Sequence, residues 1–300
     1  MTISIGMTVI ARPILFLHEF AADYASWEPQ LRYFSRRHRC IAYSARGYTP
    51  SEAPAAEAFT YEHFRDDALA VLDHLGIEAA HLVGLSMGAY SSLQVGLISP
   101  ERVLSLTLAG VGSGSEPARI EAFRESAQRN ARDFETLGSP EVAKTYGQSP
   151  NRIAFKVKDP RGFVEFMAAL ARHDAQGSAH TQRGFQGGRP SLYAFEEQIR
   201  RLTRPVLIVV GDEDDACIEP SLFLKQKHSG RRAGDVSEDR PRPQSRGAGA
   251  VQRNARALPG AGGSGSLAAA RSCLAACLRM GPRRQSVALA QSGLSRDVGP

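Results

Sequence analysis

The residue best placed to do chemistry in this sequence is Ser86, at the centre of the pentapeptide Gly-Leu-Ser-Met-Gly (84–88). The apolar run 80–83 precedes the pentapeptide and a helical pattern follows it, as in a strand–nucleophile–helix turn. Such a turn strains the serine backbone and leaves no room for a side chain at Gly84 or Gly88. The free amides of the following helix point to where negative charge develops. The pattern predicts a nucleophile; the alternative is an ordinary serine in a glycine-containing loop.

Strands and helices alternate in the part of the chain that must position this serine. Helical spacing of apolar residues is found over 27–34, 61–75 and from Ser86 to Ile98, with Gly76 ending the second helix and Pro100 following the third. This rhythm predicts an α/β fold with a mostly parallel, doubly wound sheet. The predicted strands are the apolar runs 12–17, 40–43, 81–83, 103–110 and 204–210.

The rhythm changes after Gly114. Helical patterns occupy residues 116–137, 140–147, 160–174 and 189–202, and no strand pattern appears among them. A helical block between two strands predicts a lid over the carboxyl ends of the sheet, where open α/β sheets bind ligands. The apolar lid residues either line that pocket or pack the lid onto the core. They are Phe155, Phe163, Phe166, Met167, Leu170 and Phe185. We therefore expect core segments at 1–113 and 204–225, a lid at 114–203 and a tail at 226–300.

Composition excludes several classes of protein. No apolar run approaches the roughly 18–20 residues of a membrane span, and the first residues lack the pattern of a secretory signal, so we expect a cytoplasmic protein without a membrane partner. Four cysteines are too few for a disulfide scaffold, and we expect free thiols. Cys273 and Cys277 have no nearby histidine or further cysteine, so no metal site is expected.

The positive charge of the chain belongs to its final quarter. The net charge is +6, but residues 226–300 carry twelve Arg and one Lys against four acids, which leaves residues 1–225 net negative. Nucleic-acid binding by the folded domain is therefore not expected. All 22 aromatic residues precede residue 224. A tail rich in Gly, Arg, Ala, Ser and Pro cannot bury enough apolar surface to offset the entropy of ordering, so we expect it to be disordered.

Over roughly residues 10–225 the chain resembles the α/β-hydrolase family, and most of all its small cofactor-free esterases and lactonases of the enol-lactonase type. The resemblance rests on the strand ending at His18, the pentapeptide around Ser86, the helical insertion, and the strand followed by Gly-Asp-Glu-Asp-Asp (211–215). It implies a serine hydrolase that cleaves a small carboxylic ester or lactone by acyl transfer to water. It also implies that no metal and no organic cofactor takes part.

The resemblance assigns a role to each matching residue. Ser86 would attack the acyl carbonyl, and the backbone amides of Met87 and Phe20 would stabilise the oxyanion. The acid of the family falls on Asp214, which is otherwise a simple loop carboxylate. Asp215 is the alternative acid, and is otherwise a turn former. The implied partner is a small ester or lactone; neither its identity nor an oligomeric state follows from these residues.

Two departures from the family pattern matter. The chain has His18-Glu19 where the family commonly has His-Gly, which affects the first oxyanion donor. The family also supplies a general base, a histidine roughly 25–30 residues after the acid, and this chain has none there. His228 is too near Asp214, and all other histidines precede it. These are His18, His38, His63, His74, His81, His173 and His180. A chain without the base is either an inactive hydrolase or a non-catalytic ligand-binding member of the family.

The composition changes abruptly near Lys225, which suggests a hydrolase C-terminus read out of frame. Synonymous codons for residues 228–252, read one base later, can encode a strand, a Gly-His turn and a helix start. The recovered histidine codon would straddle Pro241 and Arg242, at the family's distance from Asp214. The sequence thus predicts that the parent protein has a complete Ser-His-Asp triad and that this chain lacks only its base.

Overall fold

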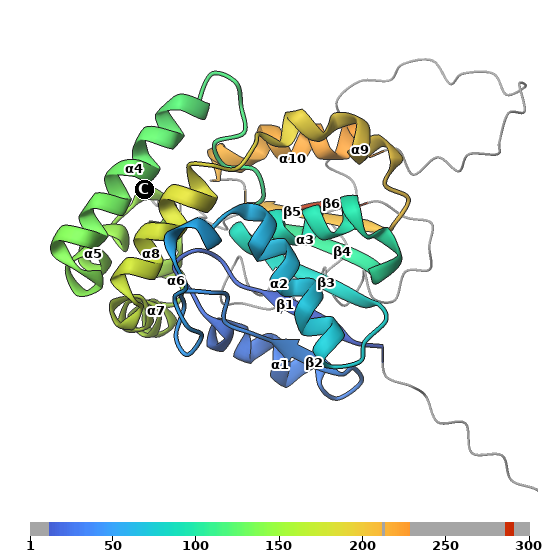
Figure 1. Cartoon of the computed structure of the whole chain (residues 1–300), viewed down its shortest axis with the longest axis horizontal. Helices are drawn as coiled ribbons and strands as arrows, with labels where there is room; N and C mark the ends of the chain where they lie inside the picture. Colours follow the sequence, from blue (N-terminus) through green and yellow to red (C-terminus); the bar gives the residue numbers. More distant parts are fainter. Residues whose placement is uncertain (1–11, 212–213, 229–285, 291–300) are drawn as a thin grey trace, which may run out of the picture.

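The structure is a computed structural model that describes residues 12–211, 214–228 and 286–290 (Figure 1). Its centre is a parallel sheet with the strand order β2-β1-β3-β4-β5-β6. The predicted α/β class with a mostly parallel sheet is confirmed. The strands are β1 (Ile14–Leu17), β2 (Cys40–Ala42), β3 (Ala80–Leu85), β4 (Val103–Ala109), β5 (Val206–Gly211) and β6 (Ser286–Ala290).

Helices surround this sheet and form a separate block at one end of it (Figure 1). In the core, strands β1, β2, β3 and β5 are followed in turn by α1 (Glu28–Phe34), α2 (Tyr61–His74), α3 (Met87–Ile98) and α10 (Asp215–Lys227). Those between β4 and β5 are α4 (Ile120–Leu137), α5 (Ser139–Tyr146), α6 (Pro150–Lys158), α7 (Pro160–Arg172), α8 (Ala175–His180) and α9 (Glu196–Arg201). A π-helical turn, Thr181–Gln186, extends α8.

The central strands are buried on both faces because alternate residues of a strand point to opposite sides. On β1, Ile14 and Phe16 pack on one face, where the Phe16 ring lies 5.1 Å from Trp27 and 6.5 Å from Phe34 on α1. Leu15 and Leu17 point to the other face and join the main core with α2 and α3. Buried β1 is thereby fixed between its neighbours β2 and β3, and it positions the turn that follows it.

The helical insert leaves the sheet after β4 and returns to it before β5 (Figure 1). Helices predicted over 116–137, 140–147 and 160–174 are confirmed as α4, α5 and α7. The prediction missed α6 and α8. Helix α6 has the signature of a start at proline, since Pro150 is its first residue, but its large apolar residues Ile153, Phe155 and Val157 lie two residues apart, which is strand-like and not helical spacing. Leu170 and Phe185 are fully buried in the main core, so these two pack the insert onto the core.

The C-terminal prediction is corrected at two places. Helix α10 continues to Lys227 and the next residue, His228, is buried. Ser286–Ala290, expected to be part of a disordered tail, forms strand β6 in parallel register with β5. The physical reason is that an open strand edge offers unpaired amide and carbonyl groups that a second strand can satisfy. The rest of the predicted tail lies outside the described residues.

Candidate active site

Ser86 lies at the turn between β3 and α3, with backbone angles φ 51° and ψ −109°. It is the one non-glycine residue with a positive φ in the described part of the chain. The conformation is held by hydrogen bonds on both sides: the Ser86 amide donates to the Ala109 carbonyl at 2.8 Å, and the Tyr90 amide donates to the Ser86 carbonyl at 3.0 Å. A strained, half-exposed serine fixed at the carboxyl end of a central strand is the geometry of an activated-serine turn.

Two glycines allow this turn because the backbone packs directly against them. A Cβ at Gly84 would collide with the backbone of Gly88, and a Cβ at Gly88 would collide with the carbonyl groups of Leu17 and His18. No flexible side chain is involved that could move aside. The crowding expected from the sequence is therefore present, and it presses the end of β1 against the first turn of α3.

This contact brings the two expected oxyanion donors to the same end of the sheet. Met87 is the first residue of α3, where helix amides have no intrahelical acceptor, and it is 1 % exposed. Phe20 follows β1 in a turn closed by a hydrogen bond from the Ala22 amide to the Glu19 carbonyl at 3.2 Å. The Phe20 ring is buried and lies 5.9 Å from Tyr146 of the insert. The turn after β1 is thus anchored in the contact between core and insert.

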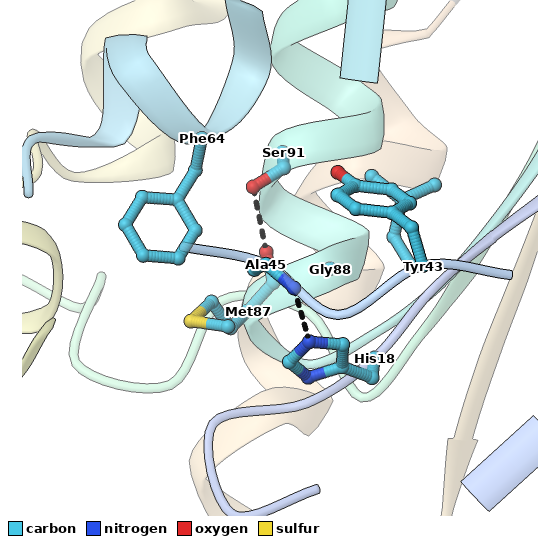
Figure 2. Close-up of a pocket in the computed structure, with 8 residues that line it drawn as sticks. His18, Tyr43, Ala45, Phe64, Met87, Gly88 and Ser91 are labelled. Carbon is cyan, nitrogen blue, oxygen red and sulfur yellow. Dashed lines mark hydrogen bonds between the residues drawn. The ribbon is translucent and has the colours of Figure 1, made fainter. Parts of the chain in front are cut away.

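His18 is engaged at both ring nitrogens, which excludes it as a free base in this arrangement. Its Nε2 accepts a hydrogen bond from the Ala45 amide at 2.9 Å, so its Nδ1 carries the proton and donates to the Glu19 carbonyl at 2.7 Å (Figure 2). Burial lowers the pKa of His18 to about 4. The neutral imidazole therefore acts as a brace between the turn after β1 and the loop after β2.

A small cavity lies beside the first turn of α3, next to Met87 and Gly88 (Figure 2). Ser91 on α3 donates to the Met87 carbonyl at 3.1 Å, and His18 closes the opposite wall. The cavity is lined by Leu17, His18, Tyr43, Ala45, Phe64, Met87, Gly88 and Ser91. Neither Ser86 nor Asp214 belongs to this lining. The cavity is a gap in packing beside this helical turn, and we do not assign it to the substrate.

Asp214 lies just after β5, at the residue preceding α10. Its carboxylate sits beside Gly110, at the end of β4: a Cβ added to Gly110 would be 3.3 Å from the Asp214 Oδ2. Since Ser86 bonds to Ala109 on the same strand, β4 lies between the serine turn and the carboxylate. Burial raises the pKa of Asp214. Asp215, by contrast, is exposed as the first residue of α10.

Cys217 is a site residue that the sequence analysis did not single out. Its buried thiol donates to the Gly110 carbonyl at 3.3 Å, beside the same glycine against which the Asp214 carboxylate lies. Burial, together with the adjacent carboxylate, raises the pKa of the thiol, so it stays protonated and can act as a donor. The spacing could have indicated this proximity. Cys217 comes three residues after Asp214, the residue that precedes α10, and side chains three residues apart lie on the same face of a helix.

A buried ion pair joins the turn after β1 to the insert. Arg152 on α6 forms a bidentate pair with Glu19, at 2.9 and 2.5 Å, and its guanidinium lies 4.7 Å above the Phe166 ring. Burial alone would lower the pKa of Arg152, but the adjacent carboxylate outweighs burial and raises it. The charges of Glu19 and Arg152 also reach Asp214, the first raising its pKa and the second lowering it. Glu19 therefore replaces the family's glycine with a charge that the insert neutralises.

No histidine is hydrogen-bonded to Ser86 or Asp214 among the residues that the structure describes. His228 bonds through Nε2 to the Arg204 carbonyl at 3.1 Å, beyond the opposite end of β5 from Asp214. His81 is the second residue of β3 and contacts Ser105, so it too lies at the far end of a strand. His173, at the end of α7, faces Asp23 at 3.9 Å. The predicted base position, across residues 241 and 242, lies outside the described residues.

The described ranges hold neither a cluster of metal ligands nor a membrane-spanning helix. No group of three or more His, Cys, Asp or Glu side chains in them is arranged to hold a metal ion. Within the same ranges, every helix is too short or too polar to cross a bilayer.

Comparisons with known proteins identify the family to which this fold belongs. A family model described as the alpha/beta hydrolase fold matches residues 12–219. The chain is 26 % identical over 217 residues to 3-oxoadipate enol-lactonase 1 of Acinetobacter baylyi, covering 72 % of this chain and 77 % of that protein. Among solved structures, the enol-lactonase of Burkholderia xenovorans has a TM-score of 0.63 at 21 % identity, covering 73 % of this chain and 80 % of that one. A thermophilic esterase of Thermogutta terrifontis has a TM-score of 0.62 at 20 % identity, covering 73 % and 79 %. The chain belongs to the α/β-hydrolase fold family.

Proposed function

We propose that this hydrolase uses Ser86 as a nucleophile to cleave a small carboxylic ester or lactone. The observation that carries the proposal is the strained Ser86 backbone, unique among the described non-glycine residues, with a half-buried Asp214 carboxylate across β4. Relatives named as an enol-lactonase and an esterase support the choice of acyl transfer. Asp214 is half-buried and Asp215 is exposed, which favours Asp214 as the acid.

In the proposed mechanism the Ser86 hydroxyl loses its proton to an imidazole while its oxygen attacks the acyl carbonyl. The amides of Met87 and Phe20 donate to the oxyanion of the tetrahedral intermediate. The imidazole then protonates the leaving alkoxide, which in a lactone stays attached to the acyl chain. Water, deprotonated by the same imidazole, releases the carboxylic acid and regenerates Ser86. Asp214 orients the imidazole and stabilises its charged form. No metal or organic cofactor takes part in these steps.

We further propose that this chain lacks the imidazole because its sequence beyond about Lys225 is out of frame. The family match ends at residue 219, close to the change in composition. Without the base, we expect the hydrolysis rate to fall by about 10⁴- to 10⁶-fold relative to the parent protein.

The test compares this chain with a second chain in which the shifted frame restores the C-terminus. The restored chain should hydrolyse p-nitrophenyl acetate and react with a fluorophosphonate, whereas the present chain should do neither at a comparable rate. Ser86→Ala in the restored chain should abolish both reactions, and full turnover by that variant would refute the role of Ser86. Rapid labelling of the present chain would show that another histidine serves as base.

The gene sequence provides an independent check on the reading frame. Read one base later, the codons of Pro241 and Arg242 should together encode a histidine. If they do not, the frame explanation fails. A restored chain that binds small lactones but never turns them over would instead identify a non-catalytic ligand-binding member of the family.

A further inference from the structure

A second buried arginine of the insert has no acidic partner. Arg189, between the π-helical turn and α9, is 8 % exposed, and no carboxylate of the described residues lies within ion-pair distance of it. Its guanidinium donates to the Ser113 carbonyl at 2.7 Å, a neutral group. Burial lowers the pKa of Arg189 to about 10, so it stays charged at neutral pH. A buried charge is normally paired, because an unpaired one has a large desolvation penalty.

Contacts with aromatic rings offset only part of the desolvation penalty of the Arg189 guanidinium. The guanidinium carbon lies 5.0 Å from the Tyr90 ring, 5.1 Å from Phe123 and 5.6 Å from Phe185. Cation–π contacts of this kind contribute roughly 0.5–2 kcal/mol each and engage the faces of the guanidinium. The N–H groups lie in its plane, and the Ser113 carbonyl takes one of them. The remaining N–H groups suit a planar oxyanion such as a carboxylate.

The position of Arg189 relates this charge to the candidate active site. Tyr90 lies on α3, one helical turn beyond Ser86, and donates to the Pro190 carbonyl at 2.8 Å. On the other side, Ser113 follows Gly110, beside which the Asp214 carboxylate lies. Arg189 therefore lies between the helix that follows Ser86 and the segment that follows β4.

We propose that Arg189 binds the anionic group of the ligand, so that the substrate is a small ester or lactone that also carries a carboxylate. The substrate class rests on the proposed function, whereas anion binding at Arg189 does not. The charge of the ligand would supply the partner that the chain leaves out, and the aromatic rings would hold the guanidinium in place. A neutral ester would leave the cation uncompensated and should bind less well.

Butanoate and butanamide, which have nearly the same shape but differ in charge, provide the test. Binding of each to the full chain at pH 7 can be followed by NMR titration. The chain should bind butanoate at least tenfold more tightly than butanamide. Arg189→Gln, which keeps a donor for Ser113, should lose this preference and change butanamide binding less than twofold. Arg183→Gln removes an arginine from the same segment that is paired with Glu135, and it should retain the preference.

Equal affinity of the wild-type chain for the acid and the amide would overturn the proposal, as would an unchanged preference in Arg189→Gln. If Arg189→Gln does not fold, Arg189→Lys should keep part of the preference, and butanoate, but not butanamide, should raise the melting temperature of the wild type. An absence of that rise would also count against the site. Binding needs no turnover, so a chain that binds butanoate but never hydrolyses an ester refutes the proposed function and leaves the anion site standing.

Discussion

The turn that carries Ser86 and the loop that carries Asp214 lie on either side of β4, but different forces hold them. The Ser86 turn is packed backbone against backbone: Gly88 touches the end of β1, and the serine is forced to a φ of 51°. The Asp214 carboxylate lies beside Gly110, as does the Cys217 thiol, and feels the charges of Glu19 and Arg152. The Ser86 turn is therefore under backbone strain, whereas the Asp214 loop keeps a charged carboxylate partly away from water.

The two kinds of strain respond differently to pH. Backbone strain at Ser86 involves no proton. Burial raises the pKa of Asp214 above its ordinary value of 3.8. The ionised carboxylate therefore destabilises the folded chain above its folded-state pKa, and this penalty disappears as the pH falls below the ordinary value. The folded site is thus destabilised in two independent ways, by backbone strain at Ser86 and by desolvation of the Asp214 charge. Mutation and pH can separate the two.

The largest effect is expected from Gly88→Ala. Its Cβ would meet the carbonyl groups of Leu17, the last residue of buried strand β1, and of His18 just after it, and this backbone cannot move aside. We expect a loss of about 3 kcal/mol or more in the free energy of unfolding, measured by urea denaturation. Gly76→Ala is the matched control, because nothing lies within 4 Å of the added Cβ and only the positive φ of 62° is strained; it should cost about 1 kcal/mol. Equal losses would show that the turn is not rigidly packed.

The next effect is expected from Arg152→Met, which leaves Glu19 buried without a partner. We expect a loss of about 3 kcal/mol at pH 7. The double variant Glu19→Gln with Arg152→Met should be more stable than the single variant at pH 7. If the two variants unfold at the same urea concentration, the pair is not coupled, and the link from insert to site is weaker than its geometry suggests.

Asp214→Asn separates the acid loop from the serine turn. Removing the buried charge should raise the free energy of unfolding at pH 7, and the gain should vanish as the pH falls toward 3. Asp215→Asn is the control, since Asp215 is exposed, and its effect should stay within about 0.5 kcal/mol. A gain for Asp214→Asn that persists at pH 3 would mean that the strain at this loop is not electrostatic.

The smallest effect is expected from Ser86→Gly. Glycine adopts the positive φ without strain, so this variant should be more stable by about 1 kcal/mol, with the same gain at pH 5 and pH 7. Ser91→Gly, within α3, is the control. Its free energy of unfolding should fall by about 1 kcal/mol, because Ser91 lies inside a helix, where glycine is unfavourable. A pH-dependent gain at Ser86 would point to a charge near the serine that we have not assigned.

The serine turn could be predicted because its determinants are local. Gly84, Ser86 and Gly88 lie within five residues, and their geometry follows from an apolar strand before them and a helix after them. The parallel order of the sheet follows in the same way from alternating strands and helices. Asp214 could be named only through the resemblance to the α/β-hydrolase family, and its partial burial could not be predicted, because it depends on Gly110 at the end of another strand.

The contacts that the sequence did not reveal all join distant segments. Glu19 and Arg152 are 133 residues apart, and α6 itself was missed because its large apolar residues alternate as in a strand. Arg189 meets Ser113 across 76 residues. A single sequence gives the types of such residues but not their pairing. The prediction of a disordered tail was wrong for Ser286–Ala290, because the hydrogen-bonding capacity of an open strand edge is not visible in the composition of the segment that pairs with it.

Strand β6 also bears on how the protein behaves at high concentration. Without it, β5 would form the border of the sheet, and its residues Val206–Val210 are apolar and fully hydrogen-bonding along one side. Such borders recruit strands from other molecules. A chain shortened before Ser286 should therefore self-associate as its concentration rises, which light scattering would detect. The same reasoning makes residues 286–290 a protective cover, whose detachment would mark the onset of precipitation.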